Sequence, residues 1–430
     1  MMLFFAIFNI FIGLALFFLP FVLIAYTLKL KIINPFFIMA ALQFPVFFSK
    51  NILGPWFNFE NGVLDYWYNY SFFVQNIYTL GYVLTFAGAI IYFSRLPLVK
   101  MNKWLGSIAP KYSSQDLFWL SNIFFIFSLL VLFYLMATTT GIVHWVLDPR
   151  TGYQFNRVGN GHLFAIAIFF LSTSVVLLCL SGLSIFRFLA YGTACCFVSY
   201  LFGSKMVILE FFTFLLIGLW FKGFKYIKAL VFFGGGGAFV MMLINYGSYD
   251  LASIFKYFDY HNNSAMFYEY VSDTGFGFEG QIFITGFWEY IPRAFFPDKP
   301  FAYGDVLIRE IFWPGAAEKT HTPGMAGPVG IYGDFGILGV ILLGLLQPVA
   351  IFSAFASVYS YREFFRLQEL GVGAKGYNAN YMFIVCFAFI FAPAFLMYFP
   401  VVLGWILLMV VCGFMFFVSR FKLAVARRVR

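Results

Sequence analysis

The ionisable side chains that could most plainly take part in a reaction lie in one aromatic stretch. It begins at Gly286 and reads GFWEYIPRAFFPDKP. Residues 280–294 are too short and too polar to cross a membrane, so we expect a re-entrant or interfacial helix there. Glu289 and Arg293 are four residues apart and would share one face of that helix. A guanidinium matches phosphate oxygens through two parallel hydrogen bonds. The pair therefore indicates either a structural ion pair or part of an anion site.

Two further polar segments follow this pair. Pro297-Asp298-Lys299-Pro300 predicts a rigid charged turn, which alone indicates nothing more. His321 lies between two threonines in a segment with Pro and Gly, not on an apolar helix face, so a purely structural core histidine is less favoured than usual. The chain has four histidines and no HExxH pair, so we expect neither a catalytic metal nor a cofactor.

The amino-acid composition indicates which class of protein contains these residues. Hydrophobic residues make up 62% of the chain and charged residues 10%, whereas a soluble domain carries about 25% charged residues. The polar side chains are too few to cover a soluble globule of 430 residues. The five cysteines lie in apolar segments without CxxC spacing, which argues against a disulfide framework or a zinc site. The composition predicts a membrane protein.

Apolar stretches long enough to cross a membrane recur along the chain and predict an all-α polytopic fold with about 11 transmembrane helices (10–12). They lie near residues 3–28, 32–49, 72–94, 117–137, 163–181, 187–203, 206–221, 227–245, 336–358, 379–399 and 401–419. We expect three regions: an N-terminal bundle (1–245) of about eight helices, a long loop with short helices (246–335), and C-terminal helices with a basic tail (336–430).

The placement of lysine and arginine predicts the orientation of these helices. Most basic residues fall inside if the N-terminus is outside and the C-terminus inside. The net charge of +9 is then an orientation signal, not a nucleic-acid footprint. The aromatic segment Asn51–Tyr70 falls outside and suggests interfacial anchoring. Tyr246–Phe335 also falls outside, and a loop of about 90 residues is usually functional.

The basic residues expected outside break this charge trend. They are Lys50, Arg150, Arg157, Lys205, Lys256, Arg293, Lys299, Arg309 and Lys319. Either acids in the same loops or an anionic ligand must compensate them. Lys205 lies close to the expected membrane surface, where it could extend its ammonium to the interface or face a cavity with a lipid headgroup.

A glycine recurs at every third position from Gly324 to Gly339. On a helix this series would spiral around the axis instead of forming one stripe. We interpret it as flexible backbone that leads into the following helix, where small residues allow close packing.

Several of these motifs together resemble a known family. IPRAFFPDKP, then THTPG, then GIYGDFGILG entering a helix resembles the Wzy-type O-antigen polymerases, which join oligosaccharide repeat units in bacterial envelopes. Gly203-Ser204-Lys205 resembles the Gly-Ser-Arg turn of that family, with lysine in place of arginine. The Arg-x10-Gly spacings of Arg150 with Gly161 and of Arg293 with Gly304 are similar to a pattern of the same family.

The resemblance implies a GT-C-like fold and a metal-independent glycosyltransferase in the bacterial inner membrane. Its substrates would be undecaprenyl-diphosphate-linked oligosaccharides, and the glycan would pass from one lipid diphosphate to a second lipid-linked repeat unit on the periplasmic side. Membrane lipids and a chain-length regulator would be its partners, and nucleic acid would not.

The implied reaction assigns roles to the residues above. Cations would stabilise the charge that develops on the leaving diphosphate. The candidates, in order, are Arg293, Arg157, Arg150, Arg309, Lys299 and Lys205. The acceptor hydroxyl needs at most a general base. The candidates for it are Glu289, His321, Asp298 and Glu318, with Glu289 and His321 preferred.

Three alternatives stay open. An O-antigen ligase would use the same donor with lipid A-core as acceptor. A flippase for lipid-linked oligosaccharides is less favoured, because transporters often carry internal repeats and midplane charges. Only Glu210 lies well inside an expected span, and no repeat is visible. The third alternative is an assembly partner that docks through its aromatic loop.

Overall fold

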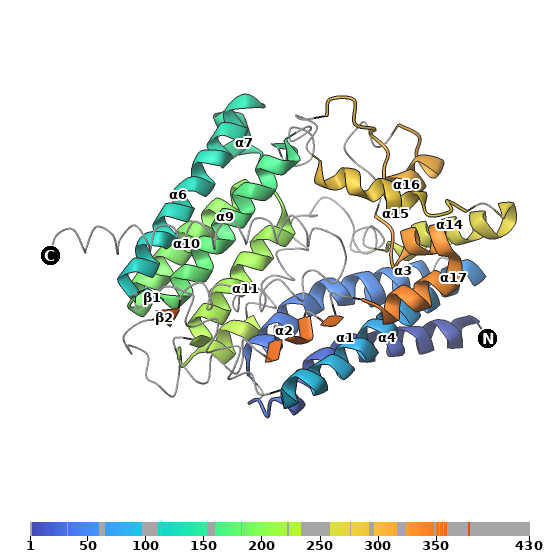
Figure 1. Cartoon of the computed structure of the whole chain (residues 1–430), viewed down its shortest axis with the longest axis horizontal. Coiled ribbons are helices and arrows are strands. Elements are labelled where there is room, and N and C mark those ends of the chain that lie inside the picture. The colour runs from blue at the N-terminus through green and yellow to red at the C-terminus, as the bar shows by residue number, and fades with distance from the viewer. Residues whose placement is uncertain are drawn as a thin grey trace. The chain divides into compact units, whose positions relative to one another are not determined.

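The computed structural model is helical and divides into two compact units, Met1–Gly88 with Lys228–Ala350, and Ala89–Ile227 with Ile351–Arg430 (Figure 1). It describes residues 2–31, 33–59, 65–96, 111–112, 114–152, 160–181, 183–221, 223–233, 259–275, 277–291, 296–315, 324–347, 350–351, 353–355, 357–358 and 377–378.

Among these residues, four helical stretches are long and apolar enough to cross a membrane. They are α1 (Met2–Thr27), α2 (Pro35–Phe48) with the π-helical turn η1 (Ser49–Leu53) and α3 (Gly54–Phe59), α4 (Tyr66–Arg95), and α6 (Ser114–Thr138). Shorter apolar helices are α9 (Gly161–Leu180), α10 (Ile185–Leu201), α11 (Lys205–Phe221) and α17 (Val329–Leu345). The prediction of an all-α polytopic membrane protein is confirmed. The count of about 11 spans stays a prediction, because 379–399 and 401–419 lie outside the described residues.

The second unit is built on the pairing of α6 with α9. Serines at this contact lie close to the neighbouring backbone: Ser128 Oγ donates to Ala167 O at 2.7 Å, and Ser121 Oγ donates to Ser174 O at 2.8 Å. Small residues allow such close approach between membrane helices. α9 also contacts α10 and α11. A two-residue antiparallel pair, β1 (Lys111–Tyr112) with β2 (Tyr377–Asn378), belongs to the same unit.

A glycine crossing joins α4 and α17 in the first unit. A Cβ on Gly81 would lie 2.6 Å from the carbonyl carbon of Gly344 and 2.9 Å from Leu345 N, so the two backbones touch. Thr85 Oγ1 donates to Leu345 O at 2.5 Å on the same face. The loop region then packs beside the ends of these two helices.

One predicted span has different bounds in the structure. The stretch 336–358 was expected as one helix, but α17 begins at Val329 and ends at Leu345. Leu346 and Gln347 are not helical, and helical residues resume at Ala350. Pro348 follows this break; a proline has no backbone N–H and disfavours helical geometry in the residue before it. The expectation of a continuous span is therefore wrong.

The glycine series makes close contacts where α17 begins. A Cβ on Gly330 would overlap Asp305 Oδ1, and a Cβ on Gly333 would lie 3.0 Å from the Phe267 ring. Gly336 has φ 62° and ψ −163° and kinks α17. The predicted close packing is confirmed, but α17 already begins at Val329, so the interpretation of Gly330 and Gly333 as flexible backbone before the helix is wrong.

Candidate functional site

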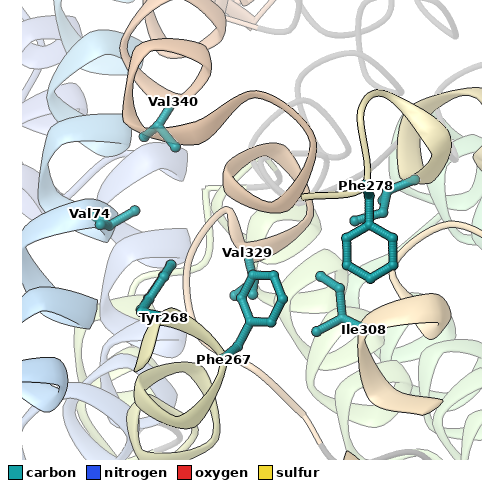
Figure 2. Close-up of a cluster of buried hydrophobic side chains, with 8 residues drawn as sticks. Val74, Phe267, Tyr268, Phe278, Ile308, Val329 and Val340 are labelled. Carbon is teal, nitrogen blue, oxygen red and sulfur yellow. The ribbon is translucent and has the colours of Figure 1, made fainter. Parts of the chain in front are cut away.

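The described part of the expected loop 246–335 contains short helices, as expected, and they pack around one apolar cluster. These helices are α14 (His261–Thr274), α15 (Gln281–Thr285), the 3-10 helix η3 (Gly286–Tyr290) and α16 (Val306–Phe312). Figure 2 shows the cluster between them and the two longer helices. Its buried members are Val74, Phe267, Tyr268, Phe278, Ile282, Ile308, Val329 and Val340. The described parts of the loop are thus a folded layer built on α4 and α17.

Asp334 holds the next segment in place. Its carboxylate oxygens accept hydrogen bonds from Ile282 N at 3.0 Å and Phe283 N at 2.7 Å, at the start of α15. Phe278 N donates to Gly333 O at 2.9 Å. The GIYGDFG motif therefore orients α15 and η3, the segment that carries Glu289.

The expected helix face shared by Glu289 and Arg293 does not form. η3 ends at Tyr290, and Ile291 is extended with φ −100° and ψ 110°. Pro292 follows, and a residue before proline disfavours helical backbone angles. The prediction of one continuous helix through residue 294 is wrong. The side chain of Glu289 and the whole of Arg293 lie outside the described residues.

The structure gives a reason for glycine at position 304, where the Arg-x10-Gly spacing of Arg293 ends. It has φ +55°, and a Cβ there would lie 3.4 Å from Gly286 Cα, so a side chain would be strained and crowded. Gly304 N also donates to Thr285 Oγ1 at 3.0 Å. Gly286 and Gly304 are therefore in contact, so the two ends of the chain segment that contains Arg293 meet. A Cβ on Gly161 would meet no heavy atom within 4 Å, so the second spacing has no such explanation.

The predicted charged turn at 297–300 is present. Lys299 N donates to Phe296 O at 3.1 Å, which closes the turn, and the Asp298 side chain is exposed. Lys299 is only 8% exposed. Its ammonium donates to Ile291 O at 3.1 Å and lies 4.3 Å from the centroid of the Tyr303 ring. Lys299 thus links the turn to Ile291 and Tyr303, in addition to carrying a positive charge.

The remaining candidates are divided between the two units. Arg309 is half-buried in α16, beside Glu310, whose Oε2 accepts from Gly315 N at 2.8 Å. Arg150 is half-buried in α8 (Pro149–Thr151) of the second unit. Lys205 is the first residue of α11, and its side chain lies outside the described residues. Arg157, Glu318 and His321 also lie outside them.

The structure adds a polar cluster that sequence reasoning missed, centred on His261 at the start of α14. His261 Nδ1 lies 2.9 Å from Ser71 Oγ, and Nε2 lies 3.2 Å from Asn51 Oδ1. Asn51 Nδ2 donates to Phe47 O at 3.0 Å, which turns the amide oxygen toward His261. His261 therefore donates from Nε2 and accepts the Ser71 hydroxyl at Nδ1.

Asp259 completes this cluster. One carboxylate oxygen accepts from the Tyr68 hydroxyl at 2.6 Å, and the other accepts from His261 N at 3.0 Å. Tyr68 is 1% exposed, so the interfacial role expected for its segment is wrong at this position. The sequence signal was the Asp259-Tyr260-His261 triplet within an outside loop, but its partners on η1 and α4 are distant in sequence.

Burial determines the charge state of His261. The ring is 1% exposed and stacks on Phe72 with 3.6 Å between centroids. Loss of solvation, and then the positive charge of Lys50, lower the pKa of His261 to about 3. The imidazole is therefore neutral near neutral pH and serves as a fixed hydrogen-bonding group.

We expect His261→Gln to reduce the loss of stability in acid, because the unfolded imidazole titrates near pH 6.5 and the folded one near 3. Below about pH 6.5 only the unfolded state takes up this proton, so wild-type unfolding free energy falls by up to about 1.4 kcal/mol per pH unit. Above about pH 7.5 both states are neutral and this contribution is constant. The check is thermal unfolding of both proteins in detergent from neutral pH to about pH 4.5, across this window. Asp259 is present in both proteins, so parallel curves would contradict the assignment.

The segment that follows THTP is bonded to α14. Asn263 Nδ2 donates to Gly324 O at 2.7 Å, and Ser264 Oγ donates to Ala326 O at 2.9 Å. Ala326 N donates to Tyr260 O at 3.3 Å. The His261 cluster and residues 324–326 are therefore held by the same helix.

These features define the class: a polytopic helical membrane protein with a folded layer of short helices between its apolar helices. Two curated proteins named O-antigen polymerase, from Salmonella typhimurium (strain LT2) and Salmonella typhi, are each 24% identical to the chain over 350 residues. The similarity covers 76% of this chain and 78% of each relative. It confirms the resemblance to Wzy-type O-antigen polymerases. No protein-family model matches the chain, and no solved structure does.

Proposed function

We propose that this chain is a polymerase of undecaprenyl-diphosphate-linked oligosaccharide repeat units, acting on the periplasmic side of the bacterial inner membrane. The observation that carries the proposal is the similarity to O-antigen polymerases over three quarters of both sequences. The apolar helices agree with a membrane-embedded enzyme of polysaccharide biosynthesis. A chain-length regulator is a further proposed partner.

The proposed reaction is a glycosyl transfer between two lipid-linked glycans. A hydroxyl oxygen at the non-reducing end of the acceptor attacks the anomeric carbon that is bonded to the donor diphosphate. A new C–O bond forms, and the bond to the diphosphate oxygen breaks with its electron pair on the leaving group. The acceptor proton passes to a general base. The candidate bases are Glu289, His321 and Asp298.

Cations are the other requirement, because negative charge grows on the diphosphate as it leaves. Arg293 is our first choice, since it lies within the chain segment closed between Gly286 and Gly304. Arg157, Arg150, Arg309 and Lys205 follow. Lys299 ranks last, because its ammonium already donates to Ile291 O. We propose that the transfer needs neither metal nor nucleotide.

Deletion of the gene distinguishes a polymerase from an O-antigen ligase. Loss of a polymerase leaves single repeat units attached to lipid A-core, because ligation continues. Loss of a ligase leaves bare core. A mutant with bare core would therefore contradict the polymerase assignment, and an unchanged long-chain glycan would contradict both.

A further inference from the structure

Lys50 lies at an irregular point of a membrane helix. α2 runs without interruption into the π-helical turn Ser49–Leu53, and the stretch Pro35–Trp56 is one of the candidate spans. Single π-helical turns within α-helices are frequent at functional sites. Ser49 Oγ donates to Pro45 O at 2.8 Å, and Asn51 Nδ2 donates to Phe47 O, so both neighbours of Lys50 are tied back to the helix. The turn thereby places Lys50 in the last part of the span, which continues to Trp56.

No acidic side chain near Lys50 compensates the positive charge of its ammonium among the residues that the structure describes. Its ammonium lies 4.8 Å from the centroid of the Tyr260 ring, which is a cation–π contact. His261 is neutral, and both carboxylate oxygens of Asp259 accept hydrogen bonds from other groups. Among the residues that the structure describes, no carboxylate forms an ion pair with Lys50. An ammonium has three donors, so it retains capacity for an anion.

Lys50 is also close to Gly324, the last residue of the THTPG motif. The Tyr260 ring that it contacts lies 3.0 Å from a Cβ built on Gly324, and Tyr260 O accepts from Ala326 N. The Tyr260 ring therefore contacts both the Lys50 ammonium and Gly324. Lys50 lies in the last part of the span Pro35–Trp56, and a lysine there extends its ammonium toward the membrane surface, where the lipid phosphate groups lie.

We propose that Lys50 binds a phosphate group of the polyprenyl diphosphate on the donor, beside Tyr260 and Gly324. This inference rests on the proposed function and adds a residue to its donor site. The same ammonium chemistry would suit the phosphate of a membrane phospholipid, so the experiment must separate these two sources.

The test uses the full-length protein in nanodiscs and four variants: Lys50→Ala, Lys50→Met, Lys50→Arg and Lys225→Ala. Methionine keeps an apolar stem without the charge, and arginine keeps the charge. Lys225 is the matched control, because its ammonium also lies over a tyrosine ring, 4.7 Å from the centroid of Tyr226. Binding of polyprenyl diphosphate and polyprenyl monophosphate is measured in neutral and in anionic phospholipid, alongside the unfolding temperature of each variant.

We expect Lys50→Ala and Lys50→Met to weaken diphosphate binding about tenfold or more, as loss of a charge-assisted hydrogen bond implies. Lys50→Arg and Lys225→Ala should bind nearly as the wild type does. Unchanged binding in Lys50→Met would overturn the inference. So would a loss that appears only in anionic phospholipid, because Lys50 would then hold a membrane lipid. A wild type that binds diphosphate without elongating glycan would contradict the proposed function and leave the Lys50 assignment standing.

Discussion

Arg293→Ala is expected to lower glycan elongation by about 10²-fold or more, the range seen when one group that stabilises developing negative charge is removed. The lipid diphosphate is already a good leaving group. The main contribution of the enzyme is therefore to stabilise the negative charge on the phosphate oxygens with cations. Arginine offers two parallel hydrogen bonds to such oxygens. Arg293→Lys should retain part of the activity, because lysine supplies charge without the planar pair of donors.

The measurement for Arg293 is polymer length in cells, together with the amount of protein in the membrane. Arg187, an exposed residue of α10, is the control, and Arg187→Ala should leave polymer length unchanged. Normal polymer in Arg293→Ala would refute the phosphate role. Loss of the protein from the membrane would instead show that Arg293 is needed for folding.

Gly81→Ala is expected to destabilise the first unit by about 1–3 kcal/mol, as overpacking a tight contact does. The added Cβ would lie 2.6 Å from the Gly344 carbonyl carbon and 2.9 Å from Leu345 N. These are backbone atoms, so α4 and α17 must separate to admit it. Elongation should fall as well, because α17 carries Asp334, which orients α15.

Gly88→Ala, two turns further along α4, is the matched control. No heavy atom lies within 4 Å of a Cβ built there. Alanine in a helix interior is favoured over glycine by about 0.5–1 kcal/mol, so this variant should be as stable as the wild type or more stable. The check is the unfolding temperature of each purified variant in detergent. Equal unfolding temperatures for Gly81→Ala and Gly88→Ala would contradict the close crossing.

Hydrophobicity predicted the long helices well, because a lipid-facing segment must be apolar along its whole length. The expected segment 3–28 corresponds to α1, and 117–137 lies within α6. The two errors in helix extent share a cause that the sequence does contain. Pro292 follows the end of η3, and Pro348 follows the break after α17. Proline explains both ends, but it is no general boundary in this chain, because Pro20 lies inside α1 and Pro45 inside α2.

The polar cluster around His261 was beyond sequence reasoning for a different reason. Asn51, Ser71 and His261 come from three separate segments, and each alone is an ordinary polar residue. Their hydrogen bonds exist only once the start of α14 lies against η1 and α4. The Arg293–Gly304 spacing was a weak signal for the same reason, since the contact of Gly304 with Gly286 is tertiary.

Elongation by the purified protein tests the central proposal most directly. The protein in nanodiscs is mixed with a lipid-diphosphate-linked repeat unit, without nucleotide and with a metal chelator, and the products are separated by length. We predict a ladder of lipid-linked chains that contain two or more repeat units, strongly reduced in Arg293→Ala. Repeat units that stay single, and only cross the bilayer when the protein is placed in proteoliposomes, would contradict the polymerase assignment and favour a flippase.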